Sequence, residues 1–95
     1  MTTRLQCCVP FCRRTTKDRH DEWVCGKHWS AVPQRERRRL ARAGRWYRKR
    51  FGQNAAWTYP AGSPKRIEAV RFDRHWRKCW ERCKRAAIEA AGGIG

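Results

Sequence analysis

Apolar residues recur at helical spacing in two long segments of the chain, residues 33–51 and residues 64–91. Spacings of three and four place such positions on one side of a helix, so we predict two amphipathic helices. The narrow apolar seam of the first consists of Leu40, Gly44, Tyr47 and Phe51. The broader face of the second consists of Phe72, His75, Trp76, Cys79, Trp80, Cys83 and Ala87. Because Gly inside a helix costs about 1 kcal/mol relative to Ala, we expect close helix packing at Gly44.

Turn-forming residues set the limits of both helices. Pro33 suits the first helical position, where its missing N–H costs nothing, and Pro64 does the same after Ser63 as N-cap. Gly52 and Gly92 can adopt the left-handed conformation that closes a helix. The remaining segments are a loop over residues 52–63 and a tail over residues 92–95.

The N-terminal segment, residues 5–30, combines two short pairs of metal-binding side chains in the pattern C-x4-C-x12-C-x2-H. Zinc prefers four tetrahedral thiolate and imidazole ligands, commonly from two such pairs. We therefore predict a closed, structural zinc knuckle. Its expected ligands are Cys7, Cys12, Cys25 and His28. Cys8 is an alternative to Cys7, and buried free cysteines are the alternative to a metal site.

The stretch RRTTKDRHDEWV separates the two ligand pairs. We expect it to form a short hairpin with Asp18-Arg19-His20-Asp21 at its tip. The N-terminus has no apolar signal segment, and no run approaches the roughly 20 apolar residues of a membrane span. We therefore expect a cytoplasmic protein, in which a reducing environment favours metal ligation over disulfides.

The motifs CCVPFC and WVCGKHW resemble the small zinc-finger proteins of bacteriophages and prophages. The resemblance covers residues 7–33 and implies a treble-clef-like knuckle, the same four ligands, DNA binding and a bacterial host cytoplasm. Phe11 stands where that pattern usually has Gly. Some related knuckles belong to HNH nucleases, but His20 and Asn54 do not complete a His-Asn-His progression.

A second group of candidate ligands lies in the second predicted helix. His75, Cys79 and Cys83 follow one another at intervals of four residues. With Cys8 or His20 as a further ligand, they would bind a second zinc ion. The alternative is that these side chains simply pack against Trp23, Trp29 or Trp46. The sequence thus predicts one zinc ion and leaves a second open.

The chain has 24 Lys and Arg against 8 Asp and Glu, a formal net charge of +16. Such an excess suits a polyanionic partner, and each predicted helix carries a basic stripe without an acid. The stripes consist of Arg35, Arg38, Arg42, Arg45 and Lys49, and of Arg71, Arg74, Lys78, Arg82 and Arg85. Trp46 and Trp57 are candidates for stacking on unpaired bases. We therefore expect binding to nucleic acid, DNA rather than RNA, mainly through phosphates.

Other functional classes fit the composition less well. An acidic host protein is the alternative partner, with the chain acting as a phage-encoded adaptor or inhibitor. Membrane binding is disfavoured because the basic helices lack broad Leu and Phe faces. The few acids mostly flank arginines, and no nucleophile and base come together in the pattern. We therefore predict a single, mainly α domain over residues 1–95, stabilised by metal, that is not an enzyme and has no small-molecule substrate.

Overall fold

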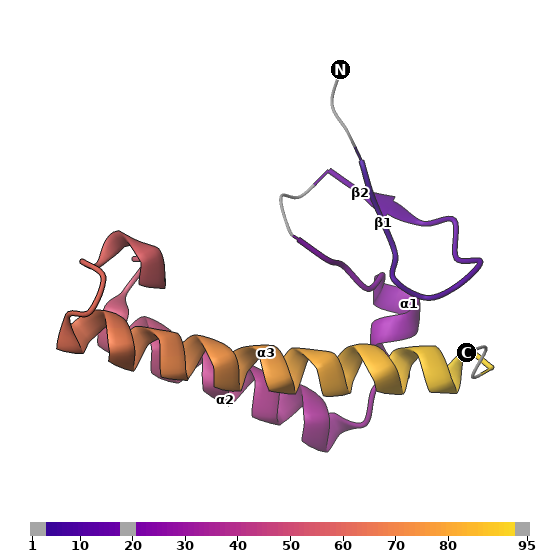
Figure 1. Cartoon of the computed structure of the whole chain (residues 1–95). Coiled ribbons are helices and arrows are strands. Elements are labelled where there is room, and N and C mark those ends of the chain that lie inside the picture. The colour runs from indigo at the N-terminus through magenta and orange to yellow at the C-terminus, as the bar shows by residue number, and fades with distance from the viewer. Residues whose placement is uncertain (1–3, 18–20, 93–95) are drawn as a thin grey trace.

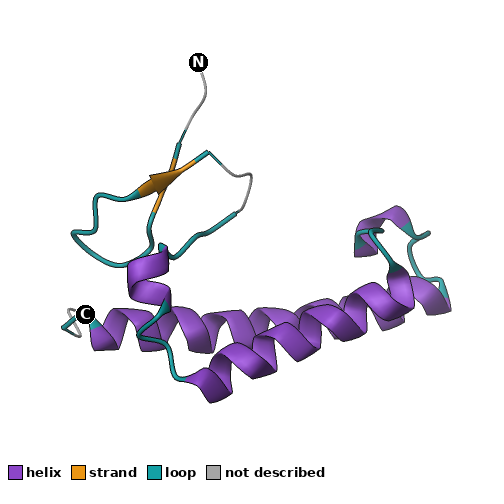
Figure 2. Cartoon of the chain, turned by 180° about the vertical axis from the view of Figure 1, so that it is seen from behind, coloured by secondary structure: helices purple, strands orange, loops and turns teal. Residues whose placement is uncertain are grey.

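The computed structural model describes residues 4–17 and 21–92. A small N-terminal knuckle is followed by two long antiparallel helices that lie side by side (Figures 1 and 2). The second long helix returns to the knuckle, so the C-terminal end of the helix lies beside it. The elements are β1 (Leu5–Gln6), β2 (Thr15–Thr16), α1 (Gly26–Trp29), α2 (Gln34–Phe51), the short 3-10 helix η1 (Ala56–Thr58) and α3 (Pro64–Ala90).

The bounds of the long helices agree with the predicted ones to within a residue. Pro33 differs from its expected role: its extended backbone (φ −54°, ψ 138°) makes it the N-cap of α2 rather than the first helical residue. Ser63 caps α3 as predicted, because its side chain accepts a hydrogen bond of 3.2 Å from the backbone N–H three residues later, and Pro64 opens the helix. At the other end of α2, Gly52 has the positive φ of 63° that glycine tolerates.

The hairpin of the knuckle differs from the predicted one. β1 and β2 pair antiparallel, with Leu5 opposite Thr16 and Gln6 opposite Thr15, so the loop between them contains the first ligand pair. The predicted hairpin lay between Cys12 and Cys25, and this placement is wrong. The Cys7 N–H donates to the Arg14 carbonyl over 3.0 Å and continues the ladder toward the loop. Residues 18–20, which include most of the predicted tip, lie outside the described residues.

One buried cluster joins the knuckle to the C-terminal half of α3. It consists of Cys7, Val9, Val24, Cys25, Val32, Cys83 and Ala87. Beside it, Trp29 of α1 stacks on Trp80 of α3 with ring centroids 6.0 Å apart, and Trp76 stacks on Trp80 at 6.3 Å. Trp23, Trp29 and Trp80 are partly buried and pack against the cluster. The knuckle is therefore docked on α3.

A second apolar region holds α2 against α3. Phe51 is buried and contacts the rings of Tyr47, Tyr59 and Phe72. The expected close approach at Gly44 is present, because a Cβ there would lie 3.6 Å from Trp76 Nε1. The predicted apolar face of α3 is wrong at one position: His75 is exposed.

Within residues 4–17 and 21–92, no helix has the length and apolar character needed to cross a membrane.

Candidate metal centre

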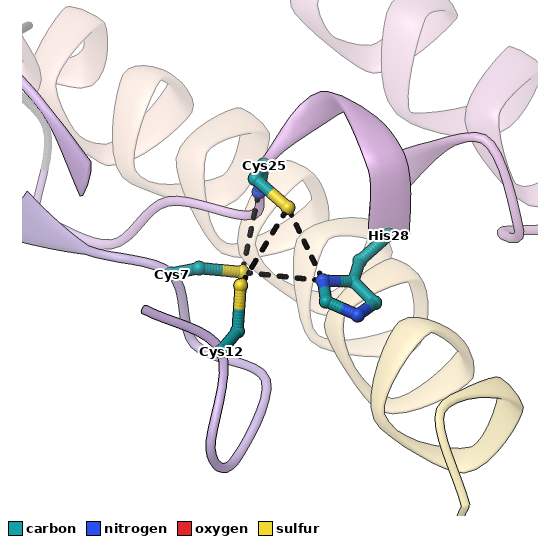
Figure 3. Close-up of side chains that lie close together, drawn as sticks. All are labelled: Cys7, Cys12, Cys25 and His28. Carbon is teal, nitrogen blue, oxygen red and sulfur yellow. Dashed lines mark hydrogen bonds between the residues drawn. The ribbon is translucent and has the colours of Figure 1, made fainter. Parts of the chain in front are cut away.

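The four predicted ligands come from two pieces of the knuckle, the loop between β1 and β2 and the start of α1. Cys7 directly follows β1, Cys12 lies in the loop between the strands, Cys25 is the N-cap of α1 and His28 lies within α1. In Figure 3 their side chains converge on one point. One ligand atom from each side chain lies within 4.8 Å of all the others. The predicted ligand set is therefore brought together and could hold one metal ion.

The distances between these atoms fit a tetrahedral ion. With Zn–S of about 2.3 Å and Zn–N of about 2.1 Å, neighbouring ligand atoms in a tetrahedron lie roughly 3.6–3.8 Å apart. Here Cys12 Sγ lies 3.8 Å from Cys25 Sγ, and Cys7 Sγ lies 3.9 Å from His28 Nδ1. Cys25 Sγ and His28 Nδ1 are closer, at 3.1 Å. Small side-chain adjustments would bring all four to bonding distance of a single ion.

The surroundings of the thiols favour ionisation of one of them. Burial raises the pKa of the Cys25 thiol. Hydrogen bonds with the backbone and ring of His28 and with the neighbouring cysteines lower it by more than burial raises it, so that the pKa is about 7. For Cys7, desolvation by burial dominates and raises the pKa. The Cys25 N–H nevertheless donates to Cys7 Sγ over 3.3 Å, a contact that stabilises a thiolate. Since thiolates are the form that binds metal, the centre suits a cation.

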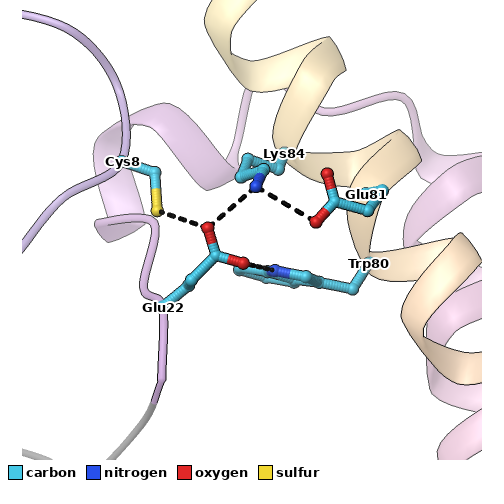
Figure 4. Close-up of polar contacts among 5 residues, drawn as sticks. All are labelled: Cys8, Glu22, Trp80, Glu81 and Lys84. Atoms are coloured by element: carbon cyan, nitrogen blue, oxygen red, sulfur yellow. Dashed lines mark hydrogen bonds and ion pairs between the residues drawn. The ribbon is translucent and has the colours of Figure 1, made fainter. Parts of the chain in front are cut away.

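Cys8, the alternative ligand, lies outside this group. Its Sγ points toward Glu22 and donates to the carboxylate over 3.8 Å (Figure 4). Glu22 also accepts hydrogen bonds from Trp80 Nε1 at 3.1 Å and from Lys84 Nζ at 2.8 Å. Burial and the nearby carboxylate raise the pKa of the Cys8 thiol. Cys8 therefore belongs to the contact between the knuckle and α3.

The side chains considered for a second zinc ion are only partly assembled. His75 Nε2 lies 3.9 Å from Cys79 Sγ, whereas Cys83 Sγ points to the Glu36 carbonyl oxygen at 3.4 Å. Among the residues that the structure describes, the only group of three or more close candidate ligands is the one in the knuckle. His20 lies outside the described residues, and Cys8 is engaged elsewhere.

The ten residues of the two basic stripes are all exposed. Some of these residues line a groove of about 730 Å³ between α2 and α3. From the predicted set, the groove gathers Arg42, Trp46, Lys78, Arg82 and Arg85. The others are exposed elsewhere along the two helices: Arg35, Arg38, Arg45, Lys49, Arg71 and Arg74.

Sequence reasoning missed several groove residues. Arg39 of α2 lines it, and so do Arg77, Glu81, His75 and Cys79 of α3. The spacing of Arg39, Arg42 and Trp46, three and four residues apart, was a usable signal, because such positions share one face of a helix. The exposed fraction of Trp46 is 51% and that of Trp57 is 72%, so both predicted stacking residues are accessible. Trp57 lies in η1, away from the groove.

Comparisons with known proteins leave the site to be interpreted from its own chemistry. No family model, no curated protein and no solved structure matches the chain. The cluster of three cysteines and one histidine could hold one metal ion, and it lies in the knuckle that packs against α3.

Proposed function

We propose that this chain is a zinc-stabilised module that binds nucleic acid along the groove between α2 and α3. The observation that carries the proposal is the composition of this groove. It gathers six Lys and Arg side chains from two helices around an exposed tryptophan. Arg39 pairs with Glu36 and Arg77 with Asp73, and Glu81 is the one acid among the described lining residues. No carboxylate in the described part of the chain lies within ion-pair distance of Arg42, Lys78, Arg82 or Arg85.

The donor set supports zinc as the ion. Three thiolates and one imidazole match a structural zinc site, in which all four positions are filled by protein. Sulfur ligands are soft and disfavour Mg²⁺ and Ca²⁺, which bind oxygen ligands. Because the knuckle has few buried aliphatic residues, zinc binding would supply much of the free energy that orders it. The ion thus has a structural role, and we propose no catalytic one.

Electrostatics favours a polyanion as the partner. Neighbouring arginines that face the same groove repel one another, and phosphates would relieve that repulsion while releasing counterions. Arg also presents a planar, bidentate donor to phosphate oxygens. The half-exposed indole of Trp46 offers a flat surface for an unpaired base. The remaining exposed stripe residues would add a longer-range, salt-sensitive attraction.

Salt dependence of binding tests this function. With six or more phosphate contacts, affinity for an oligonucleotide should fall by roughly 10³-fold or more between 50 and 200 mM salt, as measured by fluorescence anisotropy. A fall of tenfold or less contradicts the proposal. So does a stoichiometric protein partner that stays bound after nuclease treatment of a lysate, because it indicates the adaptor role.

Two charge-matched triple variants test the groove itself. Arg42→Gln/Lys78→Gln/Arg82→Gln should weaken binding and reduce the slope of log K against log salt by about 2–3. The control, Arg35→Gln/Arg38→Gln/Lys49→Gln, removes the same charge from exposed positions of α2 outside the groove. We expect a clearly smaller change for the control. Equal losses in the two variants would show that the groove is not the site.

A further inference from the structure

Phe11 stands out in the loop that carries the first two metal ligands. It is the one residue other than glycine with a positive φ in the described part of the chain, at 67°. Its exposed fraction is 83%, higher than that of either exposed tryptophan. The turn that contains it is tight, since the Cys12 N–H donates to the Val9 carbonyl over 3.1 Å.

Two features of Phe11, its backbone conformation and its exposed ring, do not stabilise the folded state. A left-handed backbone is strained for a residue with a Cβ, whereas glycine adopts it freely. An exposed ring also gains none of the stabilisation that burial gives a phenylalanine. Glycine at this position would carry neither penalty. The fold therefore gives no reason for an aromatic ring here, and a ligand contact does.

The surroundings of the ring indicate the chemistry of that ligand. Phe11 lines a shallow hollow of about 480 Å³ between the knuckle and the end of α3, where Ala91 lies. Arg13, Arg14 and Lys27 line the same hollow, and all three are exposed. No acid is among its lining residues in the described part of the chain. A flat ring among three cations suits a base with its neighbouring phosphates.

We propose that the knuckle loop is a second nucleic-acid contact, in which an unpaired base stacks on Phe11 while Arg13, Arg14 and Lys27 hold phosphates. This inference rests on the proposed function and adds to it a preference for single-stranded segments. The hollow is separate from the groove, because the two share no lining residue. Arg85, the last groove residue of α3, precedes Ala91 by six positions, or roughly 9 Å at 1.5 Å per residue. A strand long enough to reach both sites would bind more tightly than a short one.

The substitution Phe11→Gly tests the inference because stability and affinity should change in opposite directions. Removal of backbone strain should raise the melting temperature of the zinc-loaded protein. Loss of a stacked base should weaken binding of a single-stranded oligothymidine by about 5- to 150-fold. Binding of a blunt duplex should change less than about threefold. Phe11→Trp, which keeps a flat ring, should retain most of the affinity for the single strand.

The outcomes separate this inference from the proposed function. If Phe11→Gly binds the single strand as tightly as the wild type, while the groove triple variant still binds weakly, the knuckle contact is wrong and the groove stands. If neither variant affects binding, the proposed function itself fails. Loss of zinc in Phe11→Gly would mean that the ring supports the metal loop, which also overturns the inference. The inference is also overturned if Phe11→Gly abolishes capture of a protein partner but leaves oligonucleotide binding intact.

Discussion

Two fully buried thiols, Cys25 and Cys83, respond in opposite ways to their surroundings. The pKa of Cys25 is lowered to about 7, because hydrogen bonds from His28 and the neighbouring cysteines outweigh desolvation. The pKa of Cys83 is raised to about 11 by burial, with the Glu36 carboxylate adding to the shift. Burial alone therefore does not make a ligand. Cys25 is prepared to bind a cation, whereas Cys83 packs as a small apolar side chain.

Substitutions of Cys12 and Cys8 form a matched pair, since both residues are half-buried thiols of the knuckle. Cys12→Ser removes one of four ligands, and we expect zinc affinity to fall by more than about 100-fold, beyond the loss typical of an outer contact. Cys8→Ser should retain one ion per chain. Metal content after gel filtration measures both. Equal zinc content in the two variants would remove Cys12 from the ligand set.

Glu22 adds a polar contact between the knuckle and α3, beside the buried cluster and the stack of Trp29 on Trp80. Its carboxylate accepts hydrogen bonds from Lys84 and Trp80, and these lower its pKa. The interaction is therefore complete above the ordinary carboxyl pKa of 4.5 and is lost as the pH falls through the lowered value. Because the Glu22 side chain is 39% exposed, water screens the ion pair.

We expect Glu22→Gln to reduce the free energy of unfolding by about 0.5–1 kcal/mol at pH 7. The difference from the wild type should shrink as the pH falls below about 4.5, as followed by chemical denaturation across that range. Glu89→Gln is the control, because Glu89 is an exposed residue of α3, and it should have little effect. A Glu22→Gln effect that is constant with pH would argue against an ionic contact.

Gly44 tests the packing of α2 on α3. A Cβ added there would meet the flexible guanidinium of Arg48 at 3.2 Å and Trp76 Nε1 at an ordinary 3.6 Å. Gly44→Ala should therefore raise the free energy of unfolding by up to about 1 kcal/mol, since alanine favours the helix. Gly44→Leu should destabilise the protein, because its longer side chain would collide with Trp76. The melting temperatures of the two variants measure these effects. A higher melting temperature for Gly44→Leu would contradict close packing of Gly44 against Trp76.

Helices and strands differ in how well the sequence predicts them. Pro33, Ser63 and Pro64 act locally, so the limits of the long helices follow from nearby residues. The pairing of β1 with β2 does not, because each strand has only two residues and the ligand-bearing loop brings them together. Such short strands carry almost no periodic signal. The placement of the hairpin was therefore wrong, although a hairpin was expected.

At the scale of the whole molecule, the ligand set could be predicted and the groove could not. Short ligand pairs converge because a turn closes over few residues, so spacing predicts Cys12, Cys25 and His28 and leaves Cys7 or Cys8 as the fourth ligand. The groove depends on how α2 is rotated against α3. That rotation places Arg39 and His75 beside Trp46, although His75 has the helical spacing of the apolar face. Nucleic-acid binding and the phage resemblance stay predictions.

We propose that one zinc ion orders the knuckle and thereby keeps it docked on α3. Native mass spectrometry, combined with near-ultraviolet circular dichroism before and after chelation, tests it most directly. We expect a mass of one chain plus one zinc ion. Chelation should remove the ion, expose the ligand thiols to titration and abolish the aromatic signal from Trp29 and Trp80, which stack across the contact. A metal-free chain with freely titratable thiols and an aromatic signal unchanged by chelation would contradict the account.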